Sequence, residues 1–292
     1  MIRRQTQGSV VCPSCGRLAG VLDRRCFSCG RPHPGLFGYA PLLARFGAQG
    51  GIGNVILWGC GLVFIVSLLV DVQNVTMDFP FGLLGPSLKG GFLLGSSGAW
   101  PVFVYGRWWT PLSAGWLHGG LIHLVFNLAF LVRFLPMMEK VLGVGRTLLV
   151  YTAGSVGGFF LSSFMGRITD PRLGPPQIQL PDMLAGAQFT LGASAALSGV
   201  VGGLLYYAQK TGQRQWTQSI GQMAIFLLLF GLLIGGIDNW AHLGGFAAGY
   251  GATALLRPLH DESPVHVAAG LGCLLLSALA IAASIVFGLQ HL

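Results

Sequence analysis

The chain has 292 residues, of which 53% are hydrophobic and only 9% are charged. A soluble domain usually carries about 25% charged residues, so this composition excludes an ordinary water-soluble globule and a disordered chain. The 46 glycines follow no three-residue period, which excludes collagen. Glycine among leucine and alanine is typical of closely packed membrane helices. The net charge of +8 would suggest nucleic-acid binding unless the basic residues serve membrane orientation.

Residues 1–47 differ in composition from the rest of the chain. They contain seven arginines, four cysteines and a single acid, Asp23. No apolar run of signal-peptide length follows the first arginines, so we expect a small polar module ahead of the membrane-embedded part. Prolines and glycines between Pro32 and Gly38 are typical of a linker.

The four cysteines form two Cys-x-x-Cys-Gly motifs, Cys12/Cys15 and Cys26/Cys29, with ten residues between them. Two such turns can bind one zinc ion with four thiolates, and the glycine lets each turn tighten. Four thiolates leave no open coordination position, so this site would be structural. Two disulfides are the alternative, which a reducing compartment disfavours. The module resembles a short zinc ribbon, and because ribbons contact DNA, RNA and proteins alike, its partner is left unassigned.

Long apolar segments follow this module, and most have the 17–25 residues needed to cross about 30 Å of hydrocarbon. The loop over 71–115 contains two apolar patches too short to span, which favours an interfacial or re-entrant segment. The loop over 166–190 is rich in proline. We predict helices over residues 52–70, 116–137, 146–165, 191–209, 219–237, 240–256 and 265–289.

Basic residues predict how these helices are oriented. With the N-terminus inside, the inner segments hold thirteen of the seventeen lysines and arginines. The second, fourth and sixth predicted helices then all run from the outside to the inside, and the C-terminus lies outside. Membrane orientation therefore explains the basic charge, and no nucleic-acid partner is expected.

Polar side chains inside membrane helices are costly and therefore informative. In the second predicted helix, His123 and Asn127 are four residues apart and share one face. Two hydrogen-bond donors side by side in apolar surroundings suit an oxyanion hole. The alternative is an interhelical hydrogen-bonded pair. His118 lies five residues before His123, so on a helix it would point elsewhere.

The fourth predicted helix contains Ser194 among small residues, after Gly192 and Ala193. A nucleophile that a substrate must approach closely needs such surroundings. Serine and glycine are also common at contacts between membrane helices, so the pattern alone indicates catalysis only weakly and favours packing.

The sixth predicted helix contains His242 near its start, followed by Gly245 and Gly249 as a GxxxG face. Such a face favours tight packing against a neighbour, and the fourth helix offers a matching pair in Gly199 and Gly203. Packing of these two helices would bring His242 within hydrogen-bond reach of the serine. A lone membrane histidine is otherwise a satisfied packing residue.

Together these residues resemble the rhomboid family of intramembrane serine proteases, over residues 50–257. The resemblance is carried by H-x4-H-x3-N, G-A-S and A-H-x-G-G motifs in this order. They stand at His118, His123 and Asn127, at Gly192–Ser194, and at Ala241–Gly245.

The resemblance implies an all-α, polytopic membrane protein with a rhomboid-like six-helix bundle and a seventh, C-terminal helix. It divides the chain into a zinc-ribbon-like module with its linker (1–47), a catalytic core (48–257) and an added transmembrane helix (258–292). We expect a multi-pass protein of a bacterial-type plasma membrane, with a cytoplasmic N-terminus and an active site that opens outward.

The implied activity is cleavage of single-spanning membrane proteins near their outer membrane boundary by a Ser–His dyad, without a catalytic cofactor. Ser194 would be the nucleophile and His242 the base, with His123 and Asn127 as oxyanion donors. Four further residues would support the site structurally: His118, Gly192, Gly245 and Gly249.

Three positions depart from the family pattern. Ala195 follows the nucleophile where glycine is common, and Ser198 stands where an aromatic often stacks on the catalytic histidine. The Trp-Arg pair of the first loop is here Trp109-Thr110, with Arg107 on the other side of the tryptophans. A non-proteolytic rhomboid-like protein that binds membrane clients is therefore the alternative. A transporter or channel is disfavoured because membrane carboxylates are nearly absent.

Overall fold

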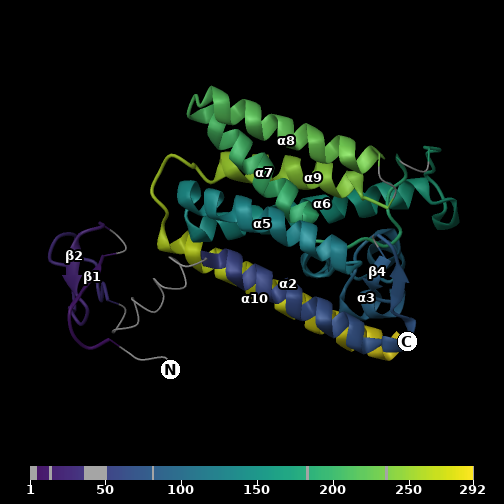
Figure 1. Cartoon of the computed structure of the whole chain (residues 1–292), viewed down its shortest axis with the longest axis horizontal. Helices are drawn as coiled ribbons and strands as arrows, with labels where there is room; N and C mark the ends of the chain where they lie inside the picture. Colours follow the sequence, from purple (N-terminus) through teal and green to yellow (C-terminus); the bar gives the residue numbers. More distant parts are fainter. Residues whose placement is uncertain are drawn as a thin grey trace. The chain divides into compact units, whose positions relative to one another are not determined.

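A computed structural model describes residues 5–12, 15–35, 51–80, 82–181, 184–233 and 236–291 (Figure 1). The chain separates into two units, Met1–Asn54 and Val55–Leu292, each described by itself below. The predicted linker after residue 35 lies outside the described residues.

The N-terminal unit contains a small antiparallel hairpin. Strand β1 (Ser9–Val11) pairs with β2 (Leu18–Gly20), with Ser9 opposite Gly20. The buried cluster in this unit consists of Cys12, Ala19 and Cys26. So few apolar side chains bury little surface, which is why small modules of this kind depend on a metal or a disulfide.

The second unit is helical, and its long helices match the seven predicted segments. Within the residues that the structure describes, five helices are long and apolar enough to cross a membrane: α2, α5, α6, α8 and α10. Helices α7 and α9 have 17 residues each, which corresponds to about 25 Å. The bounds are α2 (Gly51–Val70), α5 (Leu121–Leu142), α6 (Val144–Thr169), α7 (Ser194–Lys210), α8 (Arg214–Leu233), α9 (Asn239–Leu255) and α10 (Pro264–His291).

Several predicted helix boundaries were wrong. The second predicted helix begins at Leu121 and not at 116, because Gly120 is extended, with φ 171°, and interrupts it. The same helix continues past Pro136 to Leu142. The fourth begins at Ser194, after a glycine with positive φ, and the fifth already begins at Arg214.

The predicted long loop between α2 and α5 is folded. Strands β3 (Thr76–Asp78) and β4 (Gly82–Gly85) form a hairpin, followed by helix α3 (Leu88–Leu94), a π-turn over Trp100–Val104 and helix α4 (Thr110–Ser113). The first apolar patch lies at the hairpin, where Phe79 is exposed. The second lies in α3, where Phe92 to Leu94 are buried and contribute to the bundle.

Helices α7 and α9 run parallel and touch through their backbones. Small residues on α7 meet small residues on α9 at three successive turns, so that a Cβ added to Gly245 or Gly249 would overlap main-chain atoms of α7. The predicted GxxxG packing of these helices is confirmed. The three pairs are Ala195 with Gly245, Gly199 with Gly249, and Gly203 with Thr253.

Helix α6 completes this close contact. A Cβ on Gly154 would lie 2.9 Å from Gly199 Cα, and a Cβ on Gly158 would overlap the carbonyl oxygen of Ala241. Three helices therefore meet at one seam lined by small residues, which fixes the relative heights of α7 and α9.

Helix α10 packs on the first loop. Trp109 Nε1 donates to Ser284 Oγ at 3.0 Å, and the fully buried Arg107 guanidinium lies 4.2 Å from the Phe92 ring centroid and 5.3 Å from that of Phe287. Contacts between a guanidinium and aromatic faces are favourable, most of all away from water. Helix α10 thus contacts and positions the first loop, the segment between α2 and α5 that precedes the candidate site residues in the sequence.

Candidate active site and cysteine cluster

Ser194 is the first residue of α7. Gly192, two residues earlier, has φ 132°, which only glycine adopts readily, and this conformation stops the helix from starting sooner. The Gly192 N–H donates to the Ala114 carbonyl at 3.0 Å and ties this turn to the first loop. Ser194 is half-buried, so its hydroxyl is at the end of the helix and not in its packed interior.

His242 lies in the first turn of α9. Asp238 caps this helix: its Oδ1 accepts from the Ala241 N–H at 3.0 Å, and its Oδ2 accepts from Ser162 Oγ at 2.5 Å. No role of Asp238 was predicted from the sequence. An aspartate directly before an apolar helix is the N-cap signal that could have identified it.

The α7–α9 contact brings Ser194 and His242 to the same level of the bundle. Ala195 and Ala241, their chain neighbours, belong to one buried cluster. Among the described residues no hydrogen bond joins Ser194 Oγ to His242, and His242 Nδ1 is buried without a partner. The helices therefore bring the chain neighbours of the two residues together, and no Ser–His hydrogen bond is formed in this structure.

His123 borders the same space. The Gly119 N–H donates to His123 Nδ1 at 3.3 Å, which leaves the ring proton on Nε2. A Cβ added to Gly192 would lie 2.8 Å from His123 Nε2 and 3.6 Å from Ser194 Oγ. The ring is also close enough to His242 to interact electrostatically. His123 therefore presents a donor beside the serine.

Asn127 is buried one turn below His123, and its Nδ2 donates to the His123 carbonyl at 2.9 Å. One of its two N–H donors is thus used within the helix. The expectation that His118 points away from His123 was wrong: their ring centroids lie 5.2 Å apart, edge to face. Because His118 lies in the turn before α5, helical spacing does not apply to it.

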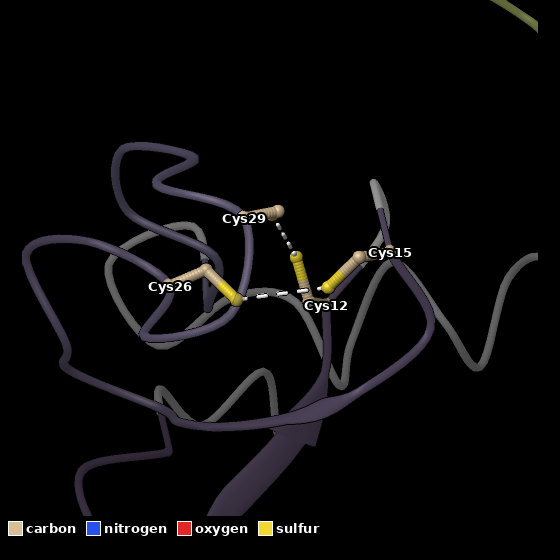
Figure 2. A group of neighbouring side chains, drawn as sticks. All are labelled: Cys12, Cys15, Cys26 and Cys29. Carbon is tan, nitrogen blue, oxygen red and sulfur yellow. Dashed lines mark hydrogen bonds between the residues drawn. The ribbon is translucent and has the colours of Figure 1, made fainter.

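Figure 2 shows the four cysteines of the N-terminal unit facing one another. Their sulfurs all lie within 4.8 Å, with Cys12 Sγ 3.7 Å from Cys29 Sγ and Cys15 Sγ 3.7 Å from Cys26 Sγ. Four thiolates around one zinc at 2.3 Å would have neighbouring sulfurs about 3.8 Å apart. All four are free thiols, so the structure does not form the alternative disulfides.

Two equivalent turns build the cluster. The backbone N–H of Cys12 donates to the Arg17 carbonyl, and that of Cys26 donates to the Arg31 carbonyl, both at 2.8 Å. The glycine after each motif has a positive φ. The pKa of the Cys29 thiol is raised to about 12: a backbone hydrogen bond with Arg31 lowers it, but desolvation and the other three sulfurs raise it more. A metal ion would therefore have to displace protons from this cluster.

The decisive comparison concerns the helical unit. A sequence model of the Rhomboid domain matches residues 105–259, more than half of the chain. The chain belongs to the rhomboid family. As the resemblance in its motifs implied, it is a mostly helical, polytopic membrane protein, and its cysteine cluster fits a zinc-ribbon-like module.

Relatives of this rhomboid chain come from plants, bacteria and protozoa. It is 31% identical over 187 residues to RHOMBOID-like protein 4 of Arabidopsis thaliana, covering 60% of this chain and 41% of the relative. It is 30% identical over 163 residues to Rhomboid protease GluP of Bacillus subtilis (strain 168), covering 53% and 27%. To Rhomboid-like protease 5 of Toxoplasma gondii it is 28% identical over 151 residues, covering 50% and 16%. The chain thus spans less than half the length of these relatives.

Proposed function

We propose that this chain is an intramembrane serine endopeptidase with Ser194 as nucleophile and His242 as general base. The proposal is supported mainly by the close contact of α7 and α9, because Ala195 and Ala241, the chain neighbours of the two residues, belong to one buried cluster. It is supported as well by Ser194 Oγ and His123 Nε2, which both border the space beside Gly192. Catalytic hydrogen bonds are often long before substrate binds, so the missing Ser–His bond is compatible with this role.

In this mechanism Ser194 Oγ attacks the scissile carbonyl while His242 takes the hydroxyl proton and then returns it to the leaving amine. His123 Nε2 and the unused Asn127 N–H donate to the oxyanion, where preorganised donors contribute most in water-poor surroundings. Water then hydrolyses the acyl-enzyme with the same base. No metal or other cofactor takes part in these steps.

Cleavage of a model single-spanning substrate in detergent tests the dyad. Ser194→Ala and His242→Ala should each lower the cleavage rate by at least about a thousandfold, because the nucleophile and its base act as one unit. Ser219→Ala is the matched control: it removes an exposed hydroxyl of α8 and should leave cleavage near the wild-type rate.

Cleavage that survives in both dyad variants would refute the assignment. A folded wild-type protein that cuts none of a panel of transmembrane substrates but still retains them would favour the alternative, a rhomboid-like protein that binds membrane clients. A fluorophosphonate label that depends on Ser194 and His242 would exclude that alternative.

The expected substrates are single-spanning membrane proteins, cut near the outer membrane boundary. Segments with small residues that unwind easily should be preferred, because the backbone must be extended to reach the serine. Orientation with the N-terminus in the cytoplasm of a bacterial-type plasma membrane rests on the distribution of basic residues. An accessibility assay on cysteines introduced into the α6–α7 and α7–α8 loops would test that orientation.

For the cysteine cluster we propose one structural zinc ion, because four thiolates at these sulfur spacings match its preferred coordination. Purified protein should contain about one zinc per chain, and Cys12→Ser or Cys26→Ser should abolish it. Cys60→Ser and Cys273→Ser, in α2 and α10, are the controls and should keep the metal. Zinc content unchanged in both cluster variants would contradict this site.

A further inference from the structure

A hollow in the helical unit lies at the opposite end of α9 from His242. It is a cavity of about 440 Å³ beside the connection between α9 and α10, which Figure 1 draws in yellow-green at the end of the bundle opposite α3 and β4. Two arginines, two histidines, two leucines and one acid line it: Arg146, Arg257, His260, His266, Leu255, Leu256 and Asp261.

Arg146 is the key residue of this cavity. It is only 3% exposed, and its guanidinium makes no ion pair among the described residues. Its Nε donates to the Leu142 carbonyl at 2.6 Å, and its Nη1 donates to the carbonyls of Arg257 and His260 at 3.2 and 2.8 Å. Its Nη2 makes no hydrogen bond. Among the described residues the ion pair joins Arg172 to Asp170, and no carboxylate lies within ion-pair distance of the Arg146 guanidinium.

The nearby carboxylate of Glu262 is already engaged. Its Oε1 accepts from the backbone N–H of Arg146 at 2.8 Å, at the start of α6, and not from the guanidinium. A buried cation without a counter-ion is unfavourable. The guanidinium thus borders a cavity that can admit an anion.

Arg257 supplies a second cation and carries backbone strain. Its φ of 51° is in the left-handed region, which costs a non-glycine residue free energy and persists only where the surroundings impose it. This conformation accompanies the hydrogen bond from Arg146 Nη1 to its carbonyl. The turn therefore places a second arginine in the lining of the cavity.

Apolar side chains lie at the cavity and near it along the chain. Leu255 and Leu256 line the cavity, and Leu255 is 84% exposed, as are Leu259 (58%) and Val265 (72%) in the segment that follows. The ends of spanning helices lie at the level of lipid headgroups. Basic pockets at this level that adjoin apolar surface match a lipid phosphate with its acyl chains alongside, whereas a free phosphate ion would gain nothing from the apolar side chains.

We propose that this cavity binds the phosphate-bearing headgroup of an anionic phospholipid, with Arg146 and Arg257 at the phosphate. The proposal does not depend on proteolytic activity. It assigns a membrane-lipid site to the α9–α10 connection, the point where the seventh helix is joined to the six-helix bundle.

Native mass spectrometry of the full-length protein, titrated with phosphatidylglycerol and with phosphatidylcholine, tests it. Phosphatidylglycerol should bind more tightly, and Arg257→Asn should weaken its binding at least about fivefold, the effect expected of one basic residue near a lipid surface. Asparagine tolerates the left-handed conformation, so this variant keeps the turn. Arg146→Gln should weaken binding further. Arg214→Asn, which removes an exposed charge at the start of α8, is the matched control and should bind normally.

Three results would overturn the proposal. Equal affinity for the two lipids would show that no anionic headgroup is recognised. Equal losses of phosphatidylglycerol binding in Arg257→Asn and Arg214→Asn would show that general surface charge, and not this cavity, causes the binding. Displacement of phosphatidylglycerol by millimolar inorganic phosphate would identify a free-anion site. Arg257 is exposed, so its variant keeps the test decisive even if Arg146→Gln fails to fold.

Discussion

At the scale of single residues, Gly192 limits what the candidate site can tolerate. It combines a left-handed backbone with close approach to the His123 ring, so a methyl group there would meet ring atoms at 2.7 and 2.8 Å. The space beside it is also bordered by Ser194 Oγ. Because Gly192 has no side chain, there is space between Ser194, the proposed nucleophile, and His123, the proposed oxyanion donor, for a substrate carbonyl.

Gly192→Ala should lower substrate cleavage by at least about tenfold, because the methyl group displaces His123, which acts as an oxyanion donor. Gly212→Ala is a matched control, because Gly212 has φ 69° but no atom within 4 Å of an added Cβ. Both variants should lose about 1 kcal/mol of stability from the positive φ, and only Gly192→Ala should lose activity. Cleavage rates and thermal unfolding in detergent measure the two effects, and equal activities would contradict this role for Gly192.

At the scale of elements, one carboxylate joins the end of α6 to the π-turn of the first loop. Asp170 accepts from Trp100 Nε1 at 3.0 Å and from Arg172 Nε and Nη2 at 2.8 and 2.7 Å. The Arg172 hydrogen bonds are the main reason why the pKa of Asp170 lies well below its usual range, and the Trp100 bond lowers it further. The charged form of Asp170 therefore stabilises this junction.

The stabilisation should depend on pH with a defined sign. The pKa of Asp170 is lower in the folded than in the unfolded protein. Its contribution to stability is therefore complete above the unfolded pKa of about 3.9, and it is lost as pH falls from there towards the folded pKa. Asp170→Asn should thus lower the thermal unfolding temperature from pH 5 to 8, and its difference from wild type should narrow below about pH 4. Asp78→Asn, at an exposed strand residue, is the control. A difference that stays constant down to the lowest pH would contradict the ionic role of Asp170.

At the scale of the whole molecule, local patterns predicted most of the framework. Seven apolar segments became the seven long helices, and the GxxxG pairs predicted which two would touch, because small residues are what let helices approach. The motif residues His123, Gly192 and Ser194 do lie around one space. The boundaries failed where glycines interrupt an apolar run, as at Gly120, since hydrophobicity continues through a break in the helix.

Contacts between distant segments could not be predicted from local pattern. Arg107 lies between Phe92 and Phe287, and no spacing rule connects the first loop with the last helix. Likewise, Arg146 reaches carbonyls beyond α9, and its uncompensated burial emerges only when the helices are assembled. In the candidate site, the edge-to-face contact of His118 with His123 depends on a turn that helical periodicity does not describe.

The 17-residue length of α7 and α9 has a consequence for how a client helix would arrive. At about 25 Å each, the pair is roughly 5 Å shorter than the hydrocarbon layer. Their backbone contact prevents them from adjusting separately to bilayer thickness, so both helices are shorter than the hydrocarbon layer at the same place. A membrane-spanning segment drifting toward Ser194 would pass from a thick lipid layer into a shallower zone and expose about one helical turn to water. Bilayer thickness, and not only side-chain chemistry, would then select the clients that unwind.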